Sequence, residues 1–403
     1  MVSKRLRDVP ASPIRKLVPY AEKAKKDGVK VYHFNIGDPD IHTPDVMLEV
    51  LHTWERNPVG YASSHGEVPL LSALQTYYHG LGHTFLEAKD IQVTMGGSEA
   101  ISWAMFATCE VGDEIIVFEP FYTNYNSYAI VHDIRLTPVL TTSANGFHVP
   151  SAEEIEKKIT KRTKAILICT PNNPTGTVYT KEEMDMLVGI VKKHGLFLMS
   201  DEVYREYAYD GRKQTSLLSY MQEIPNQAIM LDSLSKRYSA CGIRIGALVS
   251  LNKEIMQGVL HIGQGRLSAG LVDQAMAAEL TRVPDTYYEG VHKEFEKRRD
   301  VLYEGMKSIP GVVIPKPEGA FYTIVGLPVD DSEHFCQWLL TDFRDPSASS
   351  GQVETVMLAP AAGFYATLGR GKNEVRIAYV LNTDAIRRCI ELLKIALAQY
   401  NNP

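Results

Sequence analysis

One lysine, Lys236, lies in a sequence context suited to covalent chemistry. It ends the motif Ser233-Leu-Ser-Lys, which directly follows the hydrophobic run 228–231, and Arg244 follows eight residues later among glycines and aliphatic residues. A lysine amine that is held near an anion and out of solvent can attack a carbonyl carbon and form a Schiff base. Most isolated Ser-Lys sequences are solvated surface loops, so the interpretation depends on the rest of the chain.

Three further polar motifs follow hydrophobic runs, and each has an ordinary reading as well. Residues 96–100 (GGSEA) could bring a helix N-terminus close to a phosphate, or form a plain strand-to-helix turn. Residues 171–176 (PNNPTG) could form a bare turn, or offer an asparagine to a phenolate-like oxygen. Asp201 ends the apolar run 196–199, where it is either a helix N-cap or the partner of a buried cation such as a protonated pyridine nitrogen.

All four motifs are expected to follow strands of one sheet. In a doubly wound sheet, ligands bind beyond the carboxyl ends of the strands. A phosphate cradle, an asparagine, an aspartate, a lysine and an arginine in this arrangement suit pyridoxal phosphate. Together they make coincidence a poor explanation.

The elements that position these motifs form an α/β pattern. Nearly continuous hydrophobic strands that alternate with helices indicate a mostly parallel sheet covered on both faces. A capping box at Thr180–Glu183 predicts the start of one such helix. The expected strands are 91–95, 114–118, 164–169, 196–199, 228–231 and 246–250.

The C-terminal part indicates a smaller α+β domain. We expect the first 40 or so residues to pack against it, which gives an arm at 1–44, a large domain at 45–290 and a small domain at 291–403. A short flexible loop is predicted at 345–351. The expected strands are 312–314, 321–325, 353–357 and 375–379, with helices over 333–341 and from 383 onward.

Composition excludes several classes of protein. The chain has 403 residues and a net charge of −6, which gives no electrostatic footprint for nucleic acid or a membrane surface. Five cysteines without paired or metal-like spacing favour free thiols, no metal site and a reducing, cytoplasmic location. The basic N-terminus leads into no apolar segment, and no run is long enough to span a membrane.

With these motifs in place, the chain resembles the class I pyridoxal-phosphate aminotransferases of fold type I, the aspartate aminotransferase family. The resemblance extends from 35–40 (NIGDPD) through the four motifs to 375–379 (VRIAY). It implies a mostly parallel, seven-stranded sheet covered by helices, a smaller α+β domain, pyridoxal phosphate as the cofactor, and a homodimer. It also implies cis peptide bonds before Pro120 and Pro174.

The resemblance also assigns roles to residues. It implies that Lys236 binds the cofactor as a Schiff base and moves protons, that Asp201 pairs with the pyridine nitrogen, and that Asn173 and Tyr204 bond the ring oxygen. Tyr122 would stack on the ring, and Tyr61 would reach the phosphate of the neighbouring subunit. The phosphate would otherwise be held by Gly97, Ser98, the backbone of Glu99, Ser233 and Arg244.

For the substrate, the resemblance gives Arg376 the α-carboxylate, with help from Gly37 and Asn173. Arg266, or less directly Arg15, could bind a second carboxylate, which favours aspartate or glutamate with 2-oxoglutarate as acceptor. An aromatic or aliphatic donor stays open, and the aromatic residues that leave room for it are Tyr20, Tyr32, Phe34 and Phe364. A C–S β-lyase of the same fold is the alternative, and a non-catalytic regulator would need a longer N-terminal arm for its DNA-binding domain.

Overall fold

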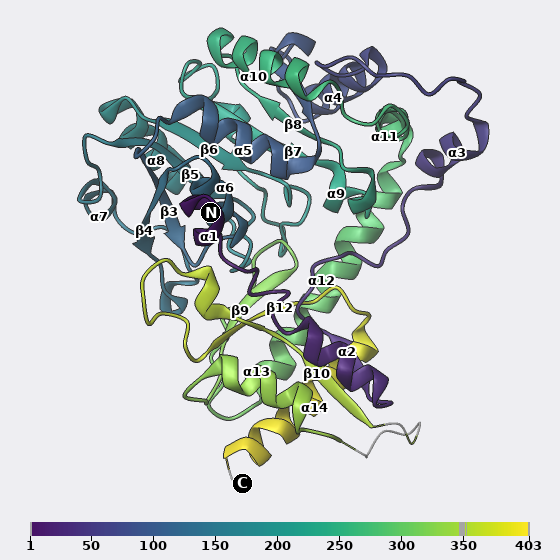
Figure 1. Ribbon diagram of the computed structural model, residues 1–403, viewed down its shortest axis with the longest axis vertical. Coiled ribbons are helices and arrows are strands. Elements are labelled where there is room, and N and C mark those ends of the chain that lie inside the picture. The colour runs from purple at the N-terminus through teal and green to yellow at the C-terminus, as the bar shows by residue number, and fades with distance from the viewer. Residues whose placement is uncertain (1, 346–350, 352, 402–403) are drawn as a thin grey trace.

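The computed structural model describes residues 2–345, 351 and 353–401. Apart from its two end residues, the loop predicted at 345–351 lies outside the described residues. Figure 1 shows a large α/β layer structure and a smaller sheet-and-helix unit, with helix α12 (Asp285–Lys307) running from one to the other.

A seven-stranded sheet forms the centre of the large part, in the order β2-β8-β7-β6-β5-β3-β4. Neighbouring strands are parallel except at β8, which is antiparallel to both β2 and β7. The strands are β2 (Ile91–Thr94), β3 (Glu114–Glu119), β4 (Arg135–Leu140), β5 (Thr163–Cys169), β6 (Phe197–Asp201), β7 (Ala228–Ser233) and β8 (Gly246–Val249). The predicted mostly parallel α/β sheet of seven strands is confirmed.

Alternate residues of these strands pack against helices on opposite faces. Ile115 and Val117 lie in the core with α5 (Gly96–Thr108), whereas Ile116 and Phe118 lie in the core with α8 (Lys181–His194). Strands buried on both faces must be apolar throughout, which is why their sequences are continuous hydrophobic runs. Thr180 caps α8 with the predicted capping box. The other covering helices are α4 (Val68–Gly80), α6 (Asn124–Val131), α7 (Ala152–Glu156), α10 (Lys253–Arg266) and α11 (Leu271–Ala278).

Strand β4 was missed by the sequence analysis. It lies at the edge of the sheet, its residues are only partly buried, and it contains Pro138. Edge strands tolerate proline because one side needs no hydrogen-bond partner. A short amphipathic strand interrupted by proline carries little hydrophobic signal and cannot be recognised from hydrophobicity alone.

The smaller unit has its own core and two small sheets. Antiparallel β11 (Ala359–Pro360), β12 (Glu374–Ala378) and β9 (Tyr322–Gly326) form one sheet, and β1 (Lys30–His33) pairs in parallel with β10 (Glu354–Met357). Its helices are α2 (Val18–Lys26), α13 (Ser332–Thr341) and α14 (Thr383–Asn401), whereas α3 (Asp45–Thr53) packs on α11 at the outer edge of the large part. The strand predicted at 312–314 is wrong, since Val313 forms only an isolated bridge to Gly326.

The N-terminal arm packs mainly on the smaller unit, through α2 against α13 and β1 against β10. Its first helix, α1 (Lys4–Asp8), lies instead against α6 of the large part, where Arg5 Nη1 donates to the carbonyl of Val131 at 3.2 Å. The domain bounds 1–44, 45–290 and 291–403 stay a prediction. The boundary between residues 290 and 291 falls inside α12.

Within the described residues, no helix is long and apolar enough to cross a membrane, and no cluster of His, Cys, Asp and Glu is arranged for a metal ion. The peptide bonds before Pro120 and Pro174 are cis, as predicted, and so are those before Pro58 and Pro171.

Candidate active site

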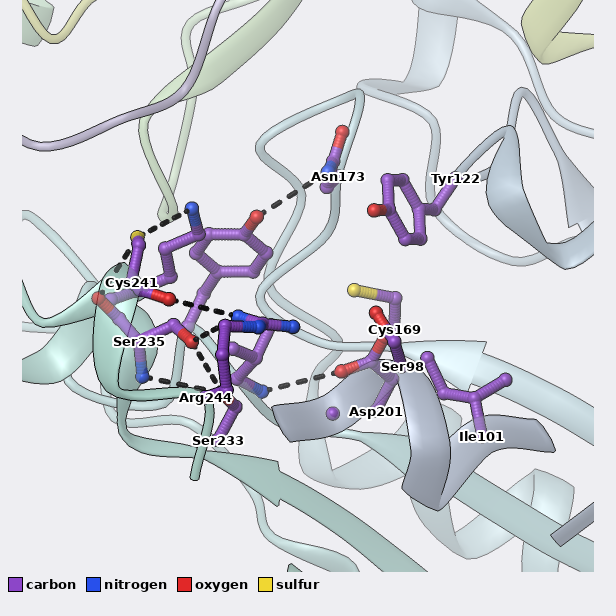
Figure 2. A pocket seen from close by; sticks show the side chains of 14 residues that line it. Ser98, Ile101, Tyr122, Cys169, Asn173, Asp201, Ser233, Ser235, Cys241 and Arg244 are labelled. Atoms are coloured by element: carbon purple, nitrogen blue, oxygen red, sulfur yellow. Dashed lines mark hydrogen bonds between the residues drawn. The ribbon is translucent and has the colours of Figure 1, made fainter. Parts of the chain in front are cut away.

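A cavity of about 150 Å³ lies at the ends of strands β2, β3, β5, β6 and β7 of the large sheet. Figure 2 shows that side chains from all four motifs converge on this cavity, together with Tyr122 and Ile101. The lining residues are Gly97, Ser98, Ile101, Tyr122, Cys169, Asn173, Asp201, Val203, Tyr204, Ser233, Ser235, Lys236, Cys241 and Arg244.

One end of the cavity can hold a phosphate. Gly97 and Ser98 begin α5, so free backbone N–H groups point toward it, and Ser233 and Ser235 add hydroxyls. The Arg244 guanidinium donates to the carbonyl of Cys241 at 3.0 Å, and no ion pair with a carboxylate is found for it among the described residues. Hydroxyls, N–H groups and an unpaired guanidinium form a site for a doubly charged anion.

Two glycines allow this close approach. A Cβ atom on Gly96, whose φ is +74°, would lie 2.7 Å from Nη2 of Arg244. A Cβ atom on Gly246 would lie 2.5 Å from the backbone carbon of Gly96. The segment from Arg244 to the start of β8 and the start of α5 can therefore meet only without side chains at these positions.

Asp201 lies at the end of β6 and faces the cavity. Its Oδ2 accepts a hydrogen bond of 2.8 Å from the Tyr125 hydroxyl, and its Oδ1 accepts one of 3.4 Å from the Val203 N–H. Burial raises the pKa of Asp201 to about 6 despite these bonds. A cation placed in the cavity, such as a protonated pyridine nitrogen, would stabilise the ionised form of this buried carboxyl.

Asn173 and Tyr204 line another wall of the cavity, and Tyr322 contacts Tyr204 from behind it. Asn173 Nδ2 donates to the Tyr204 hydroxyl at 3.4 Å, and that hydroxyl donates to the hydroxyl of Tyr322 at 3.2 Å. Burial raises the pKa of Tyr204 well above its ordinary value, so the hydroxyl stays protonated. An amide and a phenol can then both donate to one ligand oxygen.

Arg376 lies in β12, just beyond this wall. Its side chain is 2% exposed, its Nη1 donates to Asn173 Oδ1 at 3.2 Å, and its Nη2 donates to the carbonyl of Asn35 at 2.6 Å. Its Nε has no hydrogen-bond partner, and burial lowers the pKa of the guanidinium. Among the residues that the structure describes, no carboxylate pairs with Arg376. A buried, unpaired guanidinium is a strong site for a carboxylate ligand.

Lys236 also lines the cavity. Its Nζ donates to the carbonyl of Gly37 at 2.7 Å and to Sγ of Cys241 at 3.3 Å. A Cβ atom on Gly37 would lie 1.7 Å from the Tyr322 hydroxyl, so only glycine fits there. The N-terminal arm thus reaches the reactive amine through its backbone.

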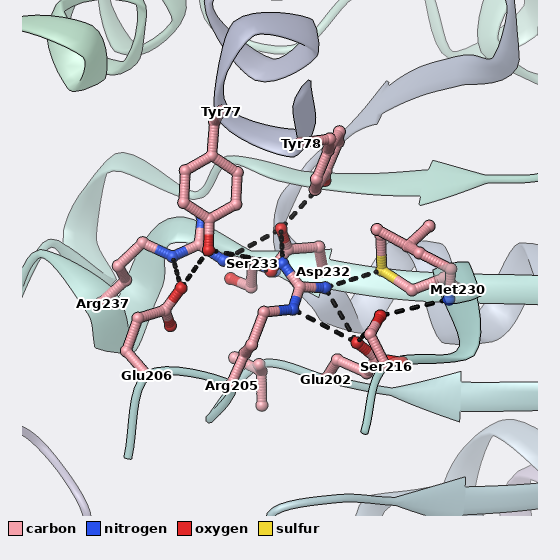
Figure 3. A network of polar contacts seen from close by, with 12 residues as sticks. Tyr77, Tyr78, Glu202, Arg205, Glu206, Ser216, Met230, Asp232, Ser233 and Arg237 are labelled. Atoms are coloured by element: carbon pink, nitrogen blue, oxygen red, sulfur yellow. Dashed lines mark hydrogen bonds and ion pairs between the residues drawn. The ribbon is translucent and has the colours of Figure 1, made fainter. Parts of the chain in front are cut away.

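A buried network of charged residues supports the lysine turn from behind (Figure 3). Asp232 is fully buried and accepts from Arg237 Nη2 at 2.9 and 3.0 Å and from the Ser233 N–H at 2.8 Å. Arg205 pairs with Glu202 at 3.0 Å on the other side of Asp232. Because Ser233 and Arg237 flank Lys236, Asp232 fixes both ends of the turn.

Besides Arg376 and Gly37, which contact residues of the lining, four more predicted residues do not line the cavity. Arg266 forms an ion pair of 2.8 Å with Glu99, so a role in binding substrate would require this pair to open. Glu99 accepts from the Met95 N–H through its side chain. Tyr61 is 78% exposed, and Arg15 lies on the exposed N-terminal arm.

The sequence analysis missed Tyr125, Ser235, Cys241 and Tyr322. Ser235 is part of the Ser233–Lys236 motif, and Cys241 lies between that motif and Arg244, so their position in this segment was the available signal. Tyr125 and Tyr322 contact Asp201 and Tyr204 from other elements. Nothing in their local sequence indicates these contacts.

The sequence matches the family described as aminotransferase class I and II over residues 29–391. The chain belongs to this family. The aspartate aminotransferase of Thermotoga maritima is 31% identical over 344 residues, which cover 85% of this chain and 89% of that protein. The match confirms the predicted resemblance, and the protein is an aminotransferase.

Solved structures give the aminotransferase the same fold. The crystal structure of the aspartate aminotransferase from Thermotoga maritima has a TM-score of 0.87 at 28% identity, covering 98% of this chain and all of that chain. An alanine aminotransferase from Pyrococcus furiosus has a TM-score of 0.87 at 25% identity, covering 99% of this chain and 100% of that chain. The aminotransferase fold is therefore shared by relatives whose names state different amino donors.

Proposed function

We propose that this aminotransferase uses pyridoxal phosphate, bound in the cavity, to move an amino group from an L-amino acid to a 2-oxo acid. The observation that carries the proposal is the convergence of Lys236 and Asp201 on one cavity, with the Arg376 guanidinium one hydrogen bond beyond Asn173. When bound, pyridoxal phosphate supplies an electrophilic aldehyde carbon and a ring that withdraws electrons from the reacting carbon.

The residues of the chain hold the cofactor in one orientation. Arg244, Ser98, Ser233, Ser235 and the first N–H groups of α5 bind the phosphate. At the other end, the Asp201 carboxylate would keep the ring nitrogen protonated. Asn173 and Tyr204 would donate to the ring oxygen, and Tyr122 would cover one face of the ring. Held in this way, the cofactor would offer its aldehyde to Lys236.

Lys236 then serves as nucleophile and as proton carrier. Its amine would be the group that joins the cofactor aldehyde with loss of water, and once the substrate amine has taken that place, the freed amine would carry the proton of the substrate α-carbon. Arg376 orients that carbon by gripping the α-carboxylate with two parallel hydrogen bonds. The carbonyl of Gly37 holds the amine in position through the 2.7 Å bond.

The substrate that we propose is a dicarboxylic or aromatic L-amino acid, with aspartate first and 2-oxoglutarate as acceptor. Arg376 explains the need for an α-carboxylate but does not select the side chain. Support for aspartate comes from the names of the relatives in Thermotoga maritima, Bacillus subtilis and Rhizobium meliloti.

We also propose a homodimer in which Tyr61 contacts the cofactor phosphate of the neighbouring subunit. Support comes from exposed apolar side chains on the same stretch of chain, with Val59 at 60%, Tyr61 at 78% and Val68 at 78% exposure. The five cysteines are free, which supports a cytoplasmic location.

The deciding experiment is an amino-donor screen with the cofactor-loaded protein. Transfer to 2-oxoglutarate should be stoichiometric and should be accompanied by conversion of the cofactor to its amine form, followed by absorbance. Release of pyruvate with ammonia or a thiol would point to the β-lyase alternative, and no turnover with any amino acid would contradict the proposal.

A further inference from the structure

Glu119, the last residue of β3, holds a segment of the smaller unit against the large sheet. Its side chain is 1% exposed, and its Oε2 accepts hydrogen bonds from the backbone N–H groups of Ala366 at 2.9 Å and Thr367 at 3.0 Å. A carboxylate that accepts two N–H bonds is a strong, directional anchor. The contact joins positions 247 and 248 residues apart in the sequence.

The anchored segment, residues 361–371, begins and ends beside Arg376. It starts at the end of β11, whose Ala359 pairs with Arg376 of β12, and returns to the chain just before β12. A second bond, from the Phe121 N–H to the carbonyl of Phe364 at 2.9 Å, fixes it at the same place. The segment therefore has two attachments to residues 119–121.

The segment places an aromatic ring over the guanidinium. The Phe364 side chain is fully buried, and its ring centroid lies 5.0 Å from the guanidinium carbon of Arg376. Tyr322 covers the same group at 4.6 Å. Excluding water from a guanidinium strengthens its interaction with a carboxylate. Displacing Phe364 would hydrate Arg376 and weaken this interaction.

On the other side of the anchor, the chain leads directly into the cofactor cavity. Tyr122, three residues after Glu119, lines the cavity and accepts a hydrogen bond of 2.7 Å from Asn124. A single short stretch, 119–122, thus contacts both the cofactor cavity and the segment 361–371 that carries Phe364.

We propose that Glu119 is a positioning residue for substrate binding, which keeps Phe364 over Arg376 by anchoring residues 361–371 to the large sheet. This inference rests on the proposed function, since it assumes that Arg376 binds the substrate α-carboxylate. Glu119 itself touches neither cavity nor substrate, and it acts through the backbone of Ala366 and Thr367.

The test compares Glu119→Ala and Glu119→Gln in the cofactor-loaded enzyme. The matched control is Asp90→Ala, which removes another buried carboxylate that accepts a backbone N–H bond, from Glu87 at 2.9 Å, within the large part. KM and kcat are measured for donor and acceptor, cofactor affinity by absorbance titration, and amide hydrogen exchange on the peptide 361–371 by mass spectrometry.

We expect Glu119→Ala to raise KM for both substrates about tenfold or more, with a smaller change in kcat. Exchange at Ala366 and Thr367 should become faster, while cofactor affinity changes by less than about twofold. Glu119→Gln keeps an oxygen that can accept the same N–H bonds, so its KM should stay close to the wild-type value. Asp90→Ala should leave KM unchanged.

Three results would overturn the inference. One is an unchanged KM in Glu119→Ala despite faster exchange in 361–371. Another is a rise in KM together with a loss of cofactor affinity, when Asp90→Ala shows the same two changes. The third is a Gln variant as impaired as the Ala variant. A wild-type enzyme without any transamination would instead refute the proposed function, which separates the two failures.

Discussion

Arg376 and Asn173 are separated by 203 positions and joined by a hydrogen bond of 3.2 Å between Nη1 and Oδ1. Asn173 also donates to Tyr204, so the arginine of the smaller unit is linked to the wall of the cofactor cavity. The group that would bind the substrate carboxylate and the groups that would bind the cofactor therefore form one continuous arrangement.

Lys236→Ala should abolish transamination, because no other amine of the described chain lines the cavity. Cofactor binding should persist through the phosphate cradle but without the visible absorbance of the lysine-bound form. Activity assays and absorbance spectra of the purified variant test both points. Near-normal transamination in Lys236→Ala would exclude this lysine as the nucleophile.

Arg376→Lys should lower kcat/KM for donor and acceptor by about a hundredfold, or about 3 kcal/mol, although it keeps the positive charge. An ammonium cannot make two parallel bonds to a carboxylate. Initial-rate kinetics with both substrates give the measurement, and the circular dichroism spectrum checks the fold. Equal kinetics in variant and wild type would show that the substrate carboxylate binds elsewhere.

The pH dependence of cofactor binding should reflect Asp201, whose pKa is raised to about 6 by burial. Below pH 6 the carboxyl is protonated in the cofactor-free protein, so a ring cation must displace that proton. Affinity for pyridoxal phosphate should therefore fall as pH drops through about 6, by up to tenfold per pH unit.

The comparison with Asp201→Asn isolates this effect from the titration of the cofactor phosphate. The variant should bind more weakly at neutral pH and lack the part of the slope that Asp201 causes. Identical slopes for variant and wild type would mean that Asp201 does not pair with the ring.

Fold stability at alkaline pH should depend on His148. Its Nδ1 lies 3.0 Å from Glu183 and its Nε2 lies 3.3 Å from Glu318, and hydrogen bonds to these two carboxylates raise the pKa of His148 to about 9. A raised histidine pKa contributes stability that is complete below the unfolded value of about 6.5 and is lost as pH rises through about 9.

The loss should be about 2–3 kcal/mol, discounted slightly because the side chain is 24% exposed. Urea unfolding of wild type and His148→Gln between pH 6 and 10 measures it. The variant should be less stable at pH 6 and should show a flatter pH profile; parallel profiles would contradict the assignment.

Arg266→Ala tests whether a second arginine selects the substrate. Because Arg266 pairs with Glu99 and does not line the cavity, we expect activity on aspartate and on an aromatic donor to fall by similar factors. Donor-specific kcat/KM values decide the point. A loss confined to aspartate would show that the ion pair opens and that Arg266 binds the side-chain carboxylate, as the sequence analysis predicted.

The sequence by itself determined the sheet, because strands buried on both faces must be continuous hydrophobic runs, and six of the seven strands could be located in this way. It also located Lys236, Asp201, Asn173 and the glycine-rich start of α5, since ligand-binding residues at strand ends stand directly after such runs. Only the edge strand β4, half exposed and interrupted by Pro138, left too weak a pattern to be recognised.

Only the tertiary structure decided which distant groups meet. Tyr125 reaches Asp201, Tyr322 reaches Tyr204, and Glu119 anchors the segment that places Phe364 over Arg376. The structure also showed Arg266 paired with Glu99 rather than facing the cavity. The contacts of Tyr322 and Glu119 depend on how the two units pack against each other, and those of Tyr125 and Arg266 depend on how helices pack on the large sheet. Side-chain pairing between elements far apart in the chain has no period or spacing in the sequence.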